Sequence, residues 1–129
     1  MPLPDTFARA LADRFGKRFS AAEAVRAHHG HDESHFSDAL PDGVVWPHST
    51  AEVVEIVNLW REHRVPLIPF GVGSSLEGHI LATHGGLSID LSEMKQVLAI
   101  HDEDMDAVVQ PGVTRKTLNA ALHGTGLFF

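Results

Sequence analysis

The chain has 129 residues, a formal net charge of −7 at pH 7, 43% hydrophobic residues and no cysteine. This length and composition suit one modest globular domain with a core of its own. The acidic balance argues against a nucleic-acid partner, and the lack of cysteine excludes disulfides and a thiol nucleophile.

The first third of the chain predicts two helices. Apolar side chains that recur every four residues predict a helix over residues 4–15. These side chains are Phe7, Leu11 and Phe15. The run Ser20-Ala21-Ala22-Glu23 has the form of a capping box, which predicts a second helix from Ser20 to about His28.

A strand, a helix and a second strand are predicted next. Residues 44–46 are apolar and end at Pro47, which predicts a short strand. Residues 49–52 form another capping box, and apolar residues at helical spacing continue from there to about residue 63. Residues 65–70 are again apolar. In one sheet, this order implies two parallel strands.

The remaining elements are shorter. Residues 74–86 show no helical period, so we expect irregular chain there. Residues 86–91 alternate as a strand does, and residues 96–100 and 107–110 predict two more strands joined by an acidic turn. Thr114 is placed to cap a last helix over residues 115–123.

The most informative segment is the glycine loop, which we define as residues 71–78, directly after the strand at 65–70. Closely spaced glycines allow consecutive backbone N–H groups to point at an anion without a Cβ in between. The dinucleotide fingerprint lacks its third glycine here, because Leu76 occupies that position, and no helix follows. The P-loop spacing of Gly73 and Gly78 lacks its Lys and its Ser or Thr.

A flavin diphosphate loop is the third possibility, because it binds through amides and hydroxyls and needs no cation. No Lys or Arg occurs between Val65 and Met94, which favours this interpretation. A glycine-rich connection without a ligand, a non-catalytic nucleotide-binding or assembly module, and half of a NAD-type dehydrogenase remain as alternatives. A Gly-x-Ser-x-Gly nucleophile is excluded, because Leu76 stands where it needs glycine.

Three ordered blocks of sequence resemble the FAD-binding domain of the vanillyl-alcohol oxidase / p-cresol methylhydroxylase (VAO/PCMH) flavoproteins. The likeness is greatest to the branch of the D-lactate dehydrogenases (cytochrome) and the glycolate oxidase FAD subunits. The blocks are Val45–Val53, Pro66–Gly78 and Gln110–Asn119.

The resemblance implies an α+β fold: a first α/β subdomain, with a short parallel sheet and helices, and the start of a second subdomain. Residues 1–39 would be an N-terminal helical extension, and residues 40–129 an incomplete FAD-binding domain. The first subdomain would span about 40–105 and the start of the second about 106–129. The apolar end at residues 126–129 leads us to expect a longer protein whose substrate site lies elsewhere.

The resemblance also implies which residues contact FAD. The glycine loop would wrap the diphosphate, Pro47 would lie near the adenine, and Gly112 with Val113 would lie at the seam with the second subdomain. The full set is Pro47, Pro69, Phe70, Gly71, Val72, Gly73, Ser74, Ser75, Leu76, Gly78, Pro111, Gly112 and Val113. Some relatives bind FAD covalently through a loop histidine, but Ser74 holds that position, so we expect non-covalent FAD.

The function implied is oxidation of a D-2-hydroxy acid, D-lactate or glycolate, to the 2-oxo acid. Electrons would pass to a cytochrome, a quinone or a partner subunit, and this part alone would be inactive. We expect no transmembrane segment, because no apolar run is long enough. A cytoplasmic location is expected, with membrane association through the electron acceptor as a further possibility. Neither catalytic residues nor metal ligands are predicted, and the polar, histidine-rich segment 28–35 is interpreted as surface.

Overall fold

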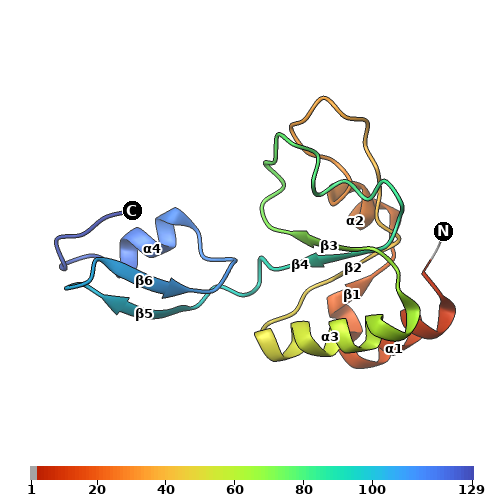
Figure 1. Ribbon diagram of the computed structural model, residues 1–129, viewed down its shortest axis with the longest axis horizontal. Coiled ribbons are helices and arrows are strands. Elements are labelled where there is room, and N and C mark those ends of the chain that lie inside the picture. Colours follow the sequence, from red (N-terminus) through yellow and green to blue (C-terminus); the bar gives the residue numbers. More distant parts are fainter. Residues whose placement is uncertain (1–2) are drawn as a thin grey trace.

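The computed structural model describes residues 3–129, which form two lobes in succession along the chain (Figure 1). The first lobe is a four-stranded sheet with helices on both faces, and the second is a two-stranded hairpin with one helix. In chain order the elements are α1 (Asp5–Phe15), the 3-10 turn η1 (Gly16–Arg18), β1 (Phe19–Ser20), α2 (Glu23–His28), β2 (Gly43–Val45), α3 (Thr50–His63), β3 (Leu67–Phe70), β4 (Leu87–Asp90), β5 (Val97–His101), β6 (Asp106–Val109) and α4 (Arg115–Ala121). The predicted α+β class is confirmed.

The four-stranded sheet has the order β1-β2-β4-β3. Strands β2 and β3 both run parallel to β4, whereas β1 runs antiparallel to β2. The predicted strand-helix-strand unit is confirmed in direction, with β4 placed between its two strands. The parallel strands therefore end at one edge of the sheet, at Val45, Phe70 and Asp90.

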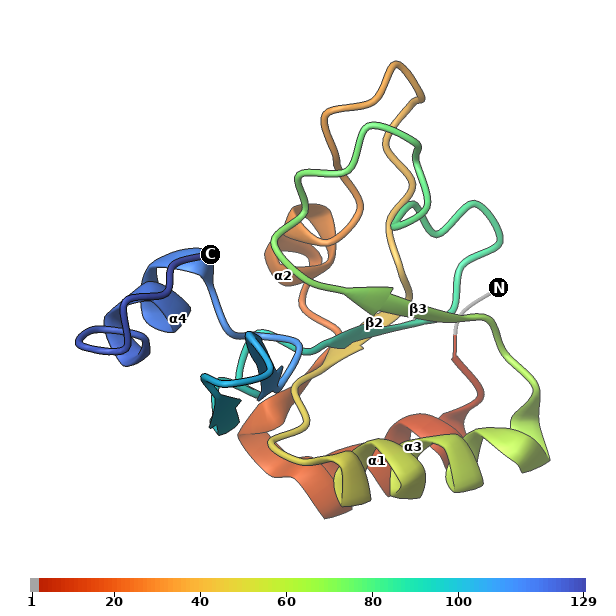
Figure 2. The same cartoon turned by 60° about the vertical axis from the view of Figure 1, so that its left-hand side comes forward.

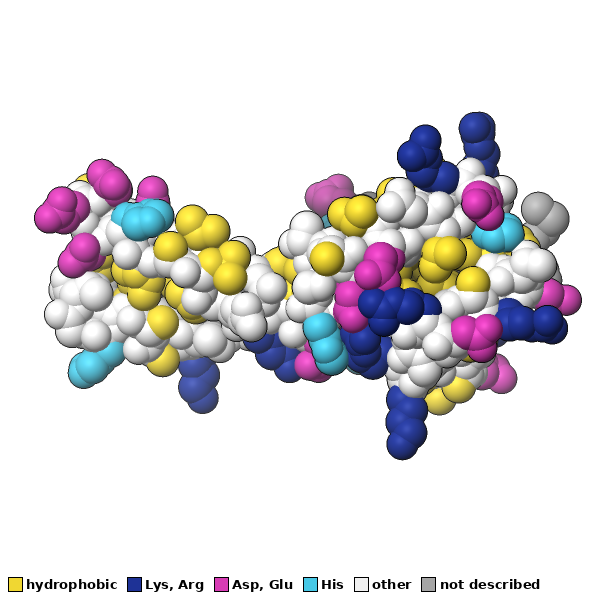
Figure 3. All heavy atoms as spheres, turned by 90° about the horizontal axis from the view of Figure 1, so that it is seen from below, with side chains coloured by type: hydrophobic (Ala, Val, Ile, Leu, Met, Phe, Trp, Pro, Cys, Tyr) yellow, Lys and Arg dark blue, Asp and Glu magenta, His cyan; other side chains and the backbone are white. Residues whose placement is uncertain are grey.

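Helices α1 and α3 cover one face of the sheet (Figure 2). The period-four side chains of α1 are buried there against α3, β2 and β4, as the pattern predicts. The buried cluster consists of Leu3, Phe7, Leu11, Phe15, Val45, Ile56, Leu87 and Ile89. On the solvent side of these helices, acidic and basic side chains are interspersed (Figure 3).

The opposite face of the sheet has a smaller core, covered by α2 and by the irregular chain after β3 (Figure 2). Its buried residues are Ile68, Phe70, Ile80 and Ala82. Because Ile68 and Phe70 alternate along β3, the strand turns both toward this second core. Phe70, the last residue before the glycine loop, is therefore anchored in this core.

The two predicted capping boxes differ in outcome. Ser49 caps α3 as predicted, because its hydroxyl accepts a hydrogen bond from the Glu52 amide at 3.2 Å. The prediction that Ser20 caps α2 is wrong. Ser20 lies in β1 opposite Val44, its hydroxyl accepts from the Ala22 amide, and α2 begins at Glu23 without a side-chain cap. Pairing with β2 keeps Ser20 extended and out of the helix.

The segment expected as an N-terminal extension is integrated into the first lobe. It contributes β1 to the sheet and α1 to the main core. The boundary between an extension over residues 1–39 and an FAD-binding domain over residues 40–129 stays a prediction. Within residues 3–129, no helix combines the length and apolar character needed to cross a bilayer.

The second lobe is joined to the first through a tight contact at Gly112. A Cβ there would lie 2.6–2.8 Å from the carbonyl oxygens of Leu91, Ser92 and Met94, closer than real Cβ atoms approach. The Gly112 amide also donates to the Met94 carbonyl at 2.8 Å. Only a glycine allows the backbone after β6 to pack on the turn after β4.

A bidentate ion pair joins the start of α3 to the η1 turn. Arg18 donates to both carboxylate oxygens of Glu52 at 2.6 and 2.8 Å. These hydrogen bonds lower the pKa of Glu52 from 4.5 to about 2. A second ion pair joins Arg14 of α1 to Glu55 of α3, and both of its side chains are about half exposed.

Replacing Glu52 by Gln is expected to lower the free energy of unfolding by about 1–2 kcal/mol at neutral pH, because a charge-assisted pair is lost. A carboxyl whose pKa is lowered by folding stabilises the protein above its unfolded-state pKa and loses that contribution as the pH falls. The wild type and Glu52→Gln should therefore converge between pH 4.5 and about pH 2 in urea unfolding experiments. Glu55→Gln is the control and should change stability by less than about 0.5 kcal/mol; equal losses would contradict the prediction.

Candidate functional site

The glycine loop leaves β3 at the carboxyl edge of the sheet with most of its amides free. Among the acceptors of residues 3–129, none bonds the backbone N–H of Gly71, Val72, Gly73, Ser74 or Leu76. Gly73 and Gly78 both have φ of +72°, a conformation that favours glycine. The loop thus presents a row of unpaired donors, which is what an anion requires.

The loop faces the second lobe across a cleft of about 380 Å³. Five of the residues predicted to bind the cofactor line this cleft together. They are Gly71, Val72, Pro111, Gly112 and Val113. Segments 40 residues apart in the sequence therefore converge on one site, as their shared assignment to the cofactor requires.

The other predicted residues occupy different positions. Pro69, Ser74 and Leu76 are exposed on the strand or the loop, whereas Phe70 and Pro47 are buried. Phe70 supports the loop from below. Pro47 is fully buried and does not line the cleft, so its predicted place near the adenine stays a prediction.

Two cations that the sequence analysis did not assign also line the cleft. Lys95 follows the turn after β4, and Arg115 is the first residue of α4. The Lys95 ammonium lies 3.2 Å from a Glu93 carboxylate oxygen, and both side chains are about half exposed. The absence of Lys and Arg from residues 66–93 therefore does not leave the cleft without positive charge, because the second lobe and its connection supply it.

A buried polar cluster fixes the edge of the sheet beneath the loop. Both oxygens of Asp90, at the end of β4, accept hydrogen bonds: one from His29 Nε2 at 2.9 Å and Trp46 Nε1 at 2.8 Å, the other from the Ser92 amide at 2.8 Å. Burial raises the pKa of Asp90, but the hydrogen bonds from His29, Ser92 and Trp46 outweigh it and hold the pKa below its usual value.

His29 is part of this cluster and not of the surface. Its Nδ1 lies 2.8 Å from the Val25 carbonyl, which can only accept, so Nδ1 is the donor in this pair, and Nε2 lies 2.9 Å from the Asp90 carboxylate. The ring also packs on Phe70 at 4.3 Å between centroids. The interpretation of residues 28–35 as a polar surface segment is therefore wrong for His29 and for Asp32, which are 3% and 4% exposed.

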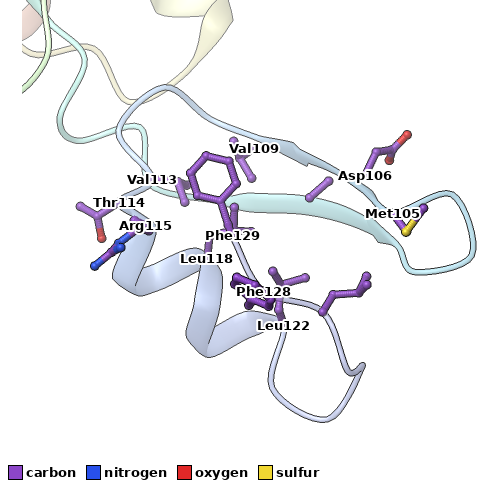
Figure 4. A pocket seen from close by; sticks show the side chains of 12 residues that line it. Met105, Asp106, Val109, Val113, Thr114, Arg115, Leu118, Leu122, Phe128 and Phe129 are labelled. Atoms are coloured by element: carbon purple, nitrogen blue, oxygen red, sulfur yellow. The ribbon is translucent and has the colours of Figure 1, made fainter.

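A second hollow, of about 480 Å³, lies within the second lobe between β6, α4 and the C-terminal residues (Figure 4). Its lining is mostly apolar, and Leu118, Leu122, Phe128 and Phe129 point toward it. None of its lining residues belongs to the glycine loop. The cleft beside that loop is therefore the candidate anion site.

Comparison with known proteins identifies the family. The model of a family described as an FAD binding domain matches residues 41–129. The chain is 47% identical over 110 residues to a probable mitochondrial D-lactate dehydrogenase of Danio rerio, covering 85% of this chain and 22% of that protein. It is 35% identical over 113 residues to glycolate oxidase subunit GlcD of Bacillus subtilis, covering 88% of this chain and 24% of that subunit.

Solved structures share the fold. An alkyldihydroxyacetonephosphate synthase superposes with a TM-score of 0.82 at 28% identity, covering 97% of this chain and 26% of that one. A p-cresol methylhydroxylase superposes with a TM-score of 0.78 at 17% identity, covering 95% and 25%, which supports the fold alone. The chain belongs to the family of PCMH-type FAD-binding domains. It spans about a quarter or less of these relatives.

The described residues fit FAD. The diphosphate of FAD carries negative charge and accepts hydrogen bonds, and the cleft offers free loop amides with Lys95 and Arg115 beside them. Gly71 has no protein atom within 4 Å of a Cβ position, so the ligand can approach its backbone closely.

Gly112→Ala is expected to lower the free energy of unfolding by about 2 kcal/mol or more, because three backbone carbonyls must move apart. Chemical denaturation of the chain measures this loss. Gly71→Ala is the matched control, because a methyl group there meets nothing within 4 Å and its stability should stay within about 0.5 kcal/mol of wild type. A loss at Gly71 as large as that at Gly112 would contradict this account of the contact between the lobes.

Proposed function

We propose that this chain is the cofactor-binding part of a flavin-dependent oxidoreductase that oxidises a D-2-hydroxy acid, D-lactate or glycolate, to the 2-oxo acid. The main support for the cofactor site is the cleft itself. Gly71 and Val72, whose amides are free, line it together with Pro111–Val113. The substrate class is supported by the names of the relatives, which are D-lactate dehydrogenases and a glycolate oxidase subunit.

The chain's own residues would bind and orient the cofactor. The amides of Gly71–Ser74 and Leu76 would donate to the diphosphate, with Pro69, Phe70, Ser75 and Gly78 shaping the loop and Lys95 and Arg115 adding positive charge. Bound FAD supplies the redox chemistry, in which the substrate α-carbon gives up a hydride.

We propose that FAD is bound without a covalent link. Ser74 stands where some relatives carry a linking histidine. The histidine nearest to the loop, His79, lies five residues after Ser74, and its Nδ1 is 2.8 Å from the Ser75 hydroxyl. A covalent flavin would survive denaturation in acid, whereas a non-covalent one is released.

The complete gene product is expected to show flavin absorbance near ~450 nm and to reduce an artificial dye with D-lactate or glycolate. Electrons would pass in the cell to a cytochrome, a quinone or a partner subunit, in the cytoplasm or at a membrane. A flavin-free protein that binds ADP-ribose would favour a nucleotide-binding module of another kind and would overturn the proposal.

The 129-residue chain alone is expected to have no turnover and to bind FAD weakly or not at all. It spans only 22% of the Danio rerio relative, and it exposes Phe128 and Phe129 at 89% and 72% beside the apolar hollow. Such exposed apolar surface favours self-association, which light scattering would detect. Dye reduction by the purified 129-residue chain at the rate of the complete gene product would refute this prediction.

Gly71→Ala in the complete gene product is expected to raise the dissociation constant for FAD by about tenfold, because the added methyl group lies where the ligand approaches. The melting temperature of the apoprotein should be unchanged, since no protein atom is displaced. Fluorescence titration with FAD measures the affinity. Unaltered affinity would place the diphosphate elsewhere.

A further inference from the structure

The segment after α2 lies beside the glycine loop. We call residues 29–36 the brace. Figures 1 and 2 show its loop, in orange, beside the green loop that follows β3. The residues that touch, Glu33 with Ser75 and Phe36 with Gly78, lie 42 residues apart in the sequence.

Two contacts fix the distal half of the glycine loop on the brace. The Glu33 amide donates to the Ser75 carbonyl at 3.1 Å. Phe36 packs so closely on Gly78 that a Cβ there would lie 2.5 Å from its ring. Gly78 is thus needed for close approach as well as for its positive φ of +72°.

Asp32 directly precedes Glu33 and is only 4% exposed. One oxygen accepts from the Ser34 amide at 3.0 Å, and the other has no hydrogen-bond partner within residues 3–129. Hydrogen bonding by Ser34 is the largest cause that lowers the pKa of Asp32. A buried carboxylate directly before Glu33, whose amide bonds the loop, calls for a role, because burying a charge is costly.

The near end of the brace supports the other half of the loop. His29 packs on Phe70, the residue before Gly71, and bonds Asp90 at the end of β4. The brace therefore touches the glycine loop or its anchor at Phe70, Ser75 and Gly78, while the amides between them stay free.

We propose that the brace positions the glycine loop and that Asp32 is a positioning residue within it. The Asp32 carboxylate fixes the turn of the brace through the Ser34 amide. From that turn the Glu33 amide and the Phe36 ring hold Ser75 and Gly78, so that Gly71 and Val72 line the cleft. This rests on the proposed function of the loop in binding the FAD diphosphate. Asp32 itself does not touch the cofactor.

The test compares Asp32→Asn and Phe36→Ala with Ile56→Val in the complete gene product. Phe36 is 52% exposed, so its loss should leave the fold intact. Ile56 is buried in the core on the other face of the sheet, and its truncation lowers stability without reaching the loop. Asp38→Asn is the charge-matched control in the same part of the chain, because Asp38 is exposed and, among residues 3–129, forms an ion pair with His31 alone.

Asp32→Asn and Phe36→Ala should each raise the FAD dissociation constant about fivefold to tenfold and reduce the hydrogen-exchange protection of the Glu33 amide. Ile56→Val should lower the melting temperature with unchanged FAD affinity, and Asp38→Asn should change neither. The proposal is overturned if Asp32→Asn and Phe36→Ala bind FAD as tightly as Ile56→Val does.

Failure of the proposed function gives a different result. If the wild type binds no FAD, the proposed function is wrong, and the role of the brace is then tested by hydrogen exchange alone. Unchanged protection of the Glu33 amide in both brace variants would show that the brace does not position the loop.

Discussion

The carboxylate of Asp90 organises the edge of the sheet on which the site depends. A buried carboxylate stays ionised only when donors surround it, and Asp90 takes its donors from three segments: His29 after α2, Trp46 after β2 and Ser92 after β4. These hydrogen bonds hold the ends of β2 and β4 and the residue after α2 together at one place. In open parallel sheets that edge is where ligands bind.

The glycine loop inherits its position from that edge. Phe70 is held by the His29 ring on one side and by the second core on the other, so the chain leaves the sheet from a fixed point. Beyond it, the free amides need an acceptor that the described residues do not supply. A bound anion would satisfy them at little cost in reorganisation, since glycine already holds the turn at Gly73.

Local sequence patterns correctly predict the features that depend on interactions between residues close together in the chain. The period-four stripe of α1 and the cap at Ser49 need only neighbours within a turn or two, and both are confirmed. The same Ser-x-x-Glu pattern at Ser20 gives the wrong helix start, because a strand 24 residues away competes for its backbone.

The rest of the site depends on long-range contacts, which no local pattern in the sequence predicts. In the sequence His29 is one polar residue among many, and its burial follows from its pairing with Asp90, 61 residues later. Arg115 likewise joins the cleft because Gly112 lets the second lobe pack on the turn after β4. The family resemblance places Pro111–Val113 near the cofactor, but the cations beside them follow from the packing.

The division of the cleft between two lobes has a mechanical consequence. One wall, at Gly71 and Val72, is fixed to the sheet, and the other, from Pro111 to Thr117, belongs to the hairpin lobe. The lobes meet through the turn at Leu91–Met94 and the Gly112 contact, so the width of the cleft is set within a few residues. A diphosphate bound by amides on one wall and drawn to Arg115 on the other would hold the lobes at one angle. Cofactor affinity and the relative position of the lobes would therefore be coupled through Gly112, although Gly112 itself carries no charge.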